Sequence, residues 1–316
     1  MNYIDNITTK HSLQQYINCK NYYLTKIISS IYNIDENNIQ KEQQIKIKIL
    51  CNWCDSLTIH NLWSKMLPVY SKIILVKDNP DYYIVINSTN EIIQKHKTIV
   101  FRMEPNMSTN SFWGYWKQPN PSEFLKIYDH ESSYNNIEWH ISLSHFQLCN
   151  LEIKKTKILS TILSDKYIDS GHKKRIDFVK YIEKFLEIDV YGNNKYNYKN
   201  YKGCLPYHEK DKSILPYKYT FNVENNNIKN YFTEKFIDAI LGECLIFYSG
   251  CPNIKEYFDE RSFVYLELDD FDKDLKIILQ AISENWHLQK LKYIKQSKLK
   301  ILENMNFFQR IEDFLI

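Results

Sequence analysis

The sequence of 316 residues lacks a secretory signal, a membrane-spanning run, a disulfide framework and a strong net charge. Residues 1–20 contain no apolar core, and no run approaches the roughly 20 apolar residues that span a bilayer. Seven cysteines, an odd number in a chain of this length, indicate reduced thiols. A net charge of +3 is too small for a nucleic-acid-binding surface. We therefore expect a cytoplasmic protein without a nucleic-acid partner.

The composition is that of a globular protein, with 44% hydrophobic and 25% charged residues. The length predicts two domains, each able to bury its own core. Tyrosine is abundant at 25 and glycine scarce at 6, and Asn, Lys and Ile are plentiful, which indicates an AT-rich genome, viral or bacterial, rather than a function. Most of the glycines fall at the predicted ends of elements, where turns and ligand approach require them: Gly171, Gly192, Gly242 and Gly250.

The stretch 215–250 is the most informative part of the sequence. Tyr217–Val223 is an apolar, β-prone run that predicts a buried strand. After a polar loop, Thr233 takes the N-cap position of a helix with apolar residues at helical spacing, and Gly242 ends that helix. A second strand follows over Cys244–Tyr248. This order predicts a unit of a parallel α/β sheet.

One lysine of this helix stands at an unfavourable position. Lys235 lies in the first turn, where the helix dipole disfavours a cation by about 0.3–1 kcal/mol. An anion bound at the helix start would remove the conflict, because the free N–H groups and the lysine would share it. The alternative is a solvated lysine paired with Glu234 or Glu224. The residues alone leave both interpretations open.

The segment Val223–Gly250 resembles the donor-site signature of the glycosyltransferase family 10 fucosyltransferases. In that signature a strand ends in Glu-Asn, a variable loop follows, and Tyr-x-Thr-Glu-Lys opens a helix before a strand that ends in Trp-Gly. Ser249 departs from it, since tryptophan is usual there, and this bears on which sugar is transferred. The signature positions are filled by Glu224, Asn225, Tyr231, Thr233, Glu234, Lys235 and Gly250.

A second basic helix start precedes this segment. Arg175 follows Gly-His-Lys-Lys at the start of a predicted helix, and a guanidinium can hold a phosphate through two hydrogen bonds. The resemblance implies that this arginine contacts the diphosphate of the donor, and Lys174 is grouped with it as donor-binding. The alternative is a solvated basic turn.

The resemblance also implies a general base. Glu104, in Phe-Arg-Met-Glu-Pro-Asn, follows the predicted strand Thr98–Phe101 and so faces the cleft of an open α/β sheet. Its place matches the proposed base of the family, and the alternative is a surface glutamate in a loop. Aromatic faces stack on sugars, so Trp113 or Trp116 is a candidate for an acceptor site. Core filling is the alternative for both, and the expected role of Trp139.

Two further motifs could hold a metal, and we expect neither to do so. Cys51-x-x-Cys54 lacks the two further ligands of a zinc site, so two small residues at a strand end are the favoured interpretation. Asp270-x-Asp272 is similar to the metal-binding pair of the other large glycosyltransferase fold. Here it precedes a terminal helix, which favours a capping and surface role.

The pattern and the resemblance together predict an α/β protein with two Rossmann-like domains facing a cleft, the GT-B type. A basic amphipathic terminal helix is expected to pack back across the domains, with a peripheral membrane contact as the alternative. The expected parts are a helical N-terminal appendage at 1–44, around a helix at His11–Ile34, an acceptor-side domain at 45–155, a donor domain at 156–285 and the C-terminal helix at 286–316.

The resemblance implies an inverting transfer of fucose from GDP-fucose to a glycan hydroxyl, without a metal or other cofactor. Glu104 would act as the base, and Arg175 with Lys235 would stabilise the leaving diphosphate. Glu234 would bind the ribose, and Glu224 would hold Lys235 or touch the sugar. Asn225 and Tyr231 would shape the donor pocket. The alternatives are a related transferase using another sugar nucleotide and a degenerate, non-catalytic glycan-binding protein; acceptor, linkage and oligomeric state stay open.

Overall fold

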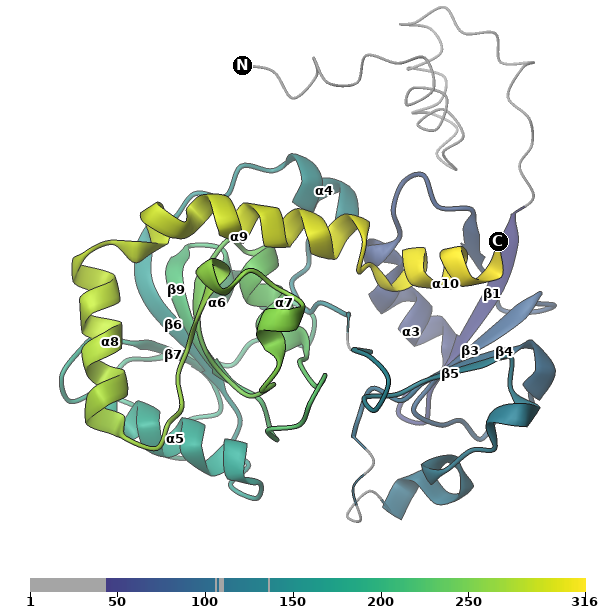
Figure 1. The fold of residues 1–316 in the computed structure, drawn as a ribbon, viewed down its shortest axis with the longest axis horizontal. Coiled ribbons are helices and arrows are strands. Elements are labelled where there is room, and N and C mark those ends of the chain that lie inside the picture. The colour runs from purple at the N-terminus through teal and green to yellow at the C-terminus, as the bar shows by residue number, and fades with distance from the viewer. Residues whose placement is uncertain (1–43, 106, 108–110, 136) are drawn as a thin grey trace, which may run out of the picture.

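The structure is a computed structural model that describes residues 44–105, 107, 111–135 and 137–316. The predicted helix at His11–Ile34 lies outside the described residues. Figure 1 shows two α/β lobes side by side, one built from each half of the chain, with the C-terminal helices running over both. None of the helices in the described part of the chain combines the length and apolarity that crossing a bilayer requires.

The first domain is built on a five-stranded parallel sheet in the order β2-β1-β3-β4-β5. Parallel strands are covered on both faces, which explains near-continuous apolar runs such as that of Tyr82–Ile86. The helix α3 (Ser56–Trp63) begins at Asp55, whose carboxylate accepts the N–H of Thr58 at 2.9 Å, and it buries Ile59 against the sheet. The strands are β1 (Ile45–Leu50), β2 (Ile73–Leu75), β3 (Tyr82–Ile86), β4 (Thr98–Phe101) and β5 (Lys126–Tyr128).

The second domain is built on a six-stranded parallel sheet in the order β11-β10-β9-β6-β7-β8. Counted along the chain within this domain, the order is that of a dinucleotide-binding sheet, 3-2-1-4-5-6. The strand order reverses between β6 and β9, and ligands of such sheets bind beyond the carboxyl ends of the strands at that place. The strands are β6 (Lys157–Leu163), β7 (Asp189–Gly192), β8 (Tyr201–Gly203), β9 (Tyr217–Val223), β10 (Leu245–Ser249) and β11 (Phe263–Tyr265).

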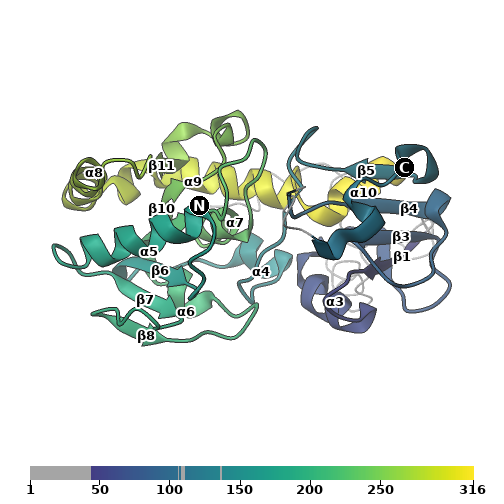
Figure 2. The same cartoon turned by 90° about the horizontal axis from the view of Figure 1, so that it is seen from below.

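Helices cover both faces of this second sheet (Figures 1 and 2). In α7 the N-cap Thr233 accepts the N–H of Lys235, and Gly242 follows the last turn. Every residue from Phe236 to Leu241 is buried, so this helix forms part of the core. The segment between β5 and β6, residues 129–156, is the connector between the domains, and it carries α4 (His145–Asn150). The helices of the second domain are α5 (Ser170–Ile182), α6 (Asp211–Ile214), α7 (Glu234–Leu241) and α8 (Phe271–Ser283). The expected fold class, two Rossmann-like domains, is confirmed.

The C-terminal segment is two helices rather than the single one predicted. The helix α9 (Trp286–Glu303) lies on the second domain, where Lys298 Nζ is 2.8 Å from Glu243 Oε1. The chain then bends at Asn306, which caps α10 (Phe307–Leu315) and donates its side-chain amide to the Met66 carbonyl at 2.8 Å. The carboxylate of Glu312 accepts the Ser71 hydroxyl at 2.7 Å, so α10 packs on the first domain.

Candidate active site

Arg175 lies at the place where the strand order of the second sheet reverses. The start of α5 packs closely against the chain after β9, since Gly171 donates its N–H to the Asn225 carbonyl at 3.2 Å. A Cβ on Gly171 would stand 1.9 Å from the Glu224 carbonyl oxygen, so only glycine permits this approach. Arg175 then donates to Asn225 Oδ1 at 3.2 Å and to Ser164 Oγ at 2.8 Å. Because Ser164 follows β6 and Asn225 follows β9, the guanidinium spans the reversal point.

The guanidinium of Arg175 is buried without a counter-charge in contact. The residue is 5% exposed, and its Nε has no hydrogen-bond partner. Among the described residues no carboxylate lies within ion-pair distance of it, and burial lowers its pKa although Glu224 and Glu234 oppose this effect from further away. A buried, unpaired charge is strongly destabilising. An anionic ligand at this position would offset that cost.

Lys235 lies close to the same place, at the start of α7. Its Nζ is 3.6 Å from Glu224 Oε2, 3.4 Å from Glu234 Oε1 and 3.1 Å from the Thr233 hydroxyl. Burial opposes its charge, but Glu234 and Glu224 raise the pKa of Lys235, and the nearby Arg175 works against them. The predicted pairing of Lys235 with Glu234 and Glu224 is therefore present. The two cations nevertheless act on one another, so one anion could meet both.

Glu224 supports the start of α7 and is closed to a ligand. The residue is 1% exposed, and its two oxygens accept the N–H and the hydroxyl of Thr233, each at 2.8 Å. A Cβ on Gly250 would stand 2.5 Å from Glu224 Cγ, so the end of β10 also needs glycine. Burial raises the pKa of Glu224, and Lys235 opposes this. Of its two predicted roles, holding Lys235 matches this geometry and contact with the sugar does not.

Glu104 faces the donor motif across the gap between the domains. It follows β4, and its N–H donates to Asn87 Oδ1 at 3.0 Å. Tyr231, from the second domain, lies near enough that the Glu104 carboxylate, in addition to burial, raises the pKa of its hydroxyl. The Glu104 side chain is exposed to the solvent of the cleft, yet protein on both sides reduces its hydration, and this desolvation raises the pKa of Glu104. Lys235 opposes the rise, whereas Glu234 adds to it. A carboxyl group with a raised pKa suits general-base chemistry.

A cavity of about 280 Å³ opens beside Glu104, between the two domains. His130 fixes the domains to each other at this cavity, since Nε2 lies 2.9 Å from the Met103 carbonyl and Nδ1 lies 3.2 Å from the Asn230 carbonyl. The lining residues come from the first domain and from the loop after β9: Arg102, Glu104, Pro105, Asp129, His130, Glu131, Ile228 and Lys229.

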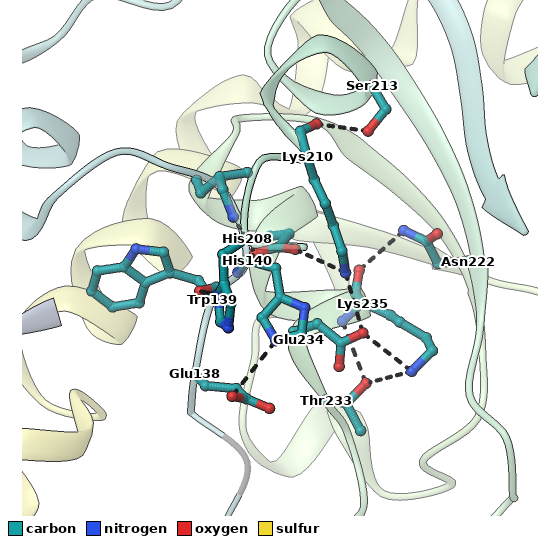
Figure 3. A network of polar contacts seen from close by, with 12 residues as sticks. Glu138, Trp139, His140, His208, Lys210, Ser213, Asn222, Thr233, Glu234 and Lys235 are labelled. Atoms are coloured by element: carbon teal, nitrogen blue, oxygen red, sulfur yellow. Dashed lines mark hydrogen bonds and ion pairs between the residues drawn. The ribbon is translucent and has the colours of Figure 1, made fainter. Parts of the chain in front are cut away.

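Glu234 is held by two lysines, one of which the sequence analysis missed. Lys235 approaches it from α7, and Lys210 Nζ lies 3.3 Å from Glu234 Oε1 (Figure 3). Burial opposes the charge of Glu234, but these two lysines hold its pKa well below the ordinary value. Lys210 also lies 3.4 Å from Asp238 Oδ2. Asp238 stands one helical turn after Glu234, on the same side of α7, so the two carboxylates flank Lys210, but nothing in the sequence marks Lys210 as their partner.

Three predicted ligand-binding side chains contact other residues in the structure. Lys174 is on the surface, with its Nζ 2.7 Å from Asp269 Oδ1, so the structure pairs it with that carboxylate, and its grouping with Arg175 as a donor ligand stays a prediction. Trp113 and Trp116 are 1% and 3% exposed. The Arg102 guanidinium covers the ring of Trp113, and Trp116 belongs to a core cluster of the first domain. Neither indole face is open to an acceptor sugar, so the core-filling alternative describes both.

The two motifs with metal-like spacing take local roles. The Sγ atoms of Cys51 and Cys54 lie 3.4 Å apart at the end of β1. Within the described ranges, no group of three or more His, Cys, Asp or Glu side chains could hold a metal ion. Asp270 caps α8 by accepting the Lys273 N–H at 3.1 Å, and Asp272 accepts the Tyr181 hydroxyl. The capping and surface role expected for the aspartates is confirmed.

Comparisons with known proteins bear on the second domain above all. Residues 152–307 match the model of the family described as glycosyltransferase family 10 (fucosyltransferase), C-terminal part. No curated protein sequence matches the chain. Two similar solved structures are an alpha1,3-fucosyltransferase with GDP, 18% identical over 94% of this chain and 97% of that chain with a TM-score of 0.49, and T4 phage beta-glucosyltransferase, 11% identical over 85% and 99% with a TM-score of 0.43.

The family match agrees with the positions of the motif. The matched residues include Arg175 and the whole segment Val223–Gly250, and both lie in the domain built on the second of the two parallel sheets. The expected resemblance is therefore confirmed. Residues 152–307 are a glycosyltransferase family 10 domain, and the chain is a glycosyltransferase.

Proposed function

We propose that the protein transfers fucose from GDP-fucose to a glycan hydroxyl with inversion at the anomeric carbon, without a metal ion. The observation that supports this most is the buried guanidinium of Arg175, which has no carboxylate in contact and lies at the reversal point of a dinucleotide-binding sheet. Lys235 lies nearby, and both cations stand near the N-terminal ends of helices, Arg175 in α5 and Lys235 in α7, whose dipoles favour an anion. Two cations at two helix N-termini are suited to bind the negative charges of a diphosphate.

The proposed reaction is a single displacement. Glu104 takes the proton of the acceptor hydroxyl, whose oxygen then attacks the anomeric carbon while the bond from that carbon to the diphosphate breaks. Desolvation strengthens Glu104 as a base by raising its pKa. Arg175 and Lys235 stabilise the charge that grows on the leaving diphosphate, which is the electrostatic role of a metal ion in other enzymes.

The remaining motif residues hold the donor. The carboxylate of Glu234, ionised between two lysines, accepts hydrogen bonds from the ribose hydroxyls. Asn225 orients the guanidinium of Arg175, and Tyr231 shapes the donor pocket from the loop after β9, near Glu104. The cavity beside Glu104 offers the acceptor hydroxyl a route to the base.

Nucleotide binding tests the donor. Thermal unfolding is followed with GDP-fucose, UDP-sugars and dTDP-sugars, since a ligand at 100 times its Kd adds about 2.7 kcal/mol of stability. We expect GDP-fucose to stabilise the protein and transfer to continue in EDTA. Stabilisation by another nucleotide sugar alone would point to a different donor, for which the replacement of tryptophan by Ser249 gives a reason. Stabilisation by none of them would indicate a degenerate, non-catalytic protein.

A further inference from the structure

Lys210 is the second of five alternating charges in a row that ends in the donor motif, and Figure 3 shows the part of the row from Lys210 through Glu234 to Lys235. The row runs from Asp238 through Lys210, Glu234 and Lys235 to Glu224. Successive charged atoms are 3.4, 3.3, 3.4 and 3.6 Å apart. The side chains are at most 21% exposed, with 16% for Lys210. At this degree of burial each charge depends on its neighbours in the row.

The backbone of Lys210 is hydrogen-bonded to the connector between the domains. Its N–H donates to the His140 carbonyl at 3.3 Å, and its own carbonyl accepts the Ser213 hydroxyl at 2.7 Å. Asp238 accepts the N–H of His140 at 2.7 Å, so the same connector residue is held from two sides. Lys210 therefore has a defined position before any ligand arrives.

If Lys210 were absent, Lys235 would be the only lysine in the row and would have to neutralise three anions. Lys235 already contacts Glu224 and Glu234, and a diphosphate would be a third anion for it. A carboxylate buried without a cation is costly, so Glu234 on its own would keep Lys235 beside it. Lys210 gives Glu234 a second cation. Lys235 can then turn toward the diphosphate without leaving Glu234 unpaired.

We infer that Lys210 is a positioning residue for the sugar nucleotide: it holds the Glu234 carboxylate in place and frees Lys235 for the diphosphate. This inference rests on the proposed function, in which Glu234 and Lys235 are the donor ligands. Lys210 itself touches neither the donor nor the reacting atoms.

The test measures GDP binding by calorimetry in Lys210→Met and in a matched control, Lys212→Met. Lys212 is an exposed lysine two residues further on and has no ion pair among the described residues. We expect Lys210→Met to weaken GDP binding about tenfold, since a hydrogen bond to a charged group contributes on that order. Lys212→Met should bind as the wild type does. In assays of transfer, the KM for the donor should rise while kcat changes little.

The pH dependence of GDP affinity distinguishes a positioning role of Lys210 from a general loss of structure in the variant. Without Lys210, the pKa of Glu234 should rise, because one of the basic groups that lower it is gone, whereas Lys235 and His140 remain. On acidification, affinity for GDP should then be lost at a higher pH in Lys210→Met than in the wild type. Equal affinities of the two proteins at every pH would overturn the inference.

A double-mutant cycle with Glu234→Gln tests the route of the effect. If Lys210 acts through Glu234, Lys210→Met should cost no further affinity in the Glu234→Gln background. The same loss in both backgrounds would refute the inference. Circular dichroism checks folding, and if Lys210→Met does not fold, Lys210→Gln, which keeps a hydrogen-bond donor, replaces it in the cycle. A wild type that binds no nucleotide refutes the proposed function instead.

Discussion

Replacing Arg175 by methionine should separate ligand binding from stability more clearly than any other change. The guanidinium makes hydrogen bonds to Asn225 and Ser164, which favour the folded state, but its burial without a contacting carboxylate opposes it. Charged hydrogen bonds contribute about 1.5–3 kcal/mol each, and burying an ion costs several kcal/mol. These terms nearly cancel, so we expect the free energy of unfolding to change by only about 1–2 kcal/mol.

The effect on the ligand should be much larger. Two lost hydrogen bonds to a diphosphate correspond to about 3 kcal/mol or more, which is at least roughly a 100-fold rise in the Kd for GDP. Calorimetric titration with GDP and thermal unfolding of the free protein measure the two quantities. Lys174→Met is the matched control on the same helix, and its exposed ion pair with Asp269 should contribute at most about 1 kcal/mol.

Two outcomes would contradict this reasoning. If Arg175→Met bound GDP with the affinity of the wild type, the guanidinium would not be a diphosphate ligand. If the variant lost many kcal/mol of stability, its burial would be structural and the argument from an unpaired charge would fail. Weakened GDP binding in Lys174→Met would support the prediction that this lysine binds the donor.

Two further changes test the geometry of the site. Glu104→Gln should lower the rate of transfer by about 100-fold or more while GDP affinity stays within a few fold, and unchanged transfer would remove Glu104 from the mechanism. Because the raised pKa of Glu104 must be exceeded for the base to be ionised, the wild-type rate should fall on acidification at a pH above that of an ordinary glutamate. Gly171→Ala should lower both the unfolding temperature and GDP affinity, because its Cβ would stand 1.9 Å from the Glu224 carbonyl, whereas Ser170→Ala, an exposed neighbour, should change neither. A stable Gly171→Ala that bound GDP normally would show that the start of α5 can move away.

Strand positions were predictable where the local signal was strong. The strands β4 and β9 begin and end at the predicted residues, because each is an apolar run between polar breaks. The helix α7 begins after the predicted N-cap Thr233. The edge strands β5 and β8 were missed, since each has three residues and is largely solvent-accessible, which leaves no periodic pattern. The bend between α9 and α10 at Asn306 was also missed, because amphipathic spacing continues across it.

The site was predictable only as far as its residues are neighbours in the sequence. The donor motif is local, so its positions follow from order and spacing. Lys210 and Ser164 join it through tertiary contacts with segments that carry no motif. The exposure of Trp113 and Trp116 depends on how the first domain packs. The sequence alone does not show whether their indole rings are buried in the core or exposed to a ligand. Lys174 and Arg175 are adjacent in the sequence, yet a helix turns their side chains to different surroundings.

The bend at Asn306 affects how the two domains can move. In the described part of the chain the backbone passes between the domains twice, once through the connector near His140 and once between α9 and α10. Two separate backbone connections restrict the rotation of one domain relative to the other to the axis that passes through both connections. Cutting the chain after Glu303 would leave a single backbone connection, so the domains would then be held by that connection and by side-chain contacts such as those of His130.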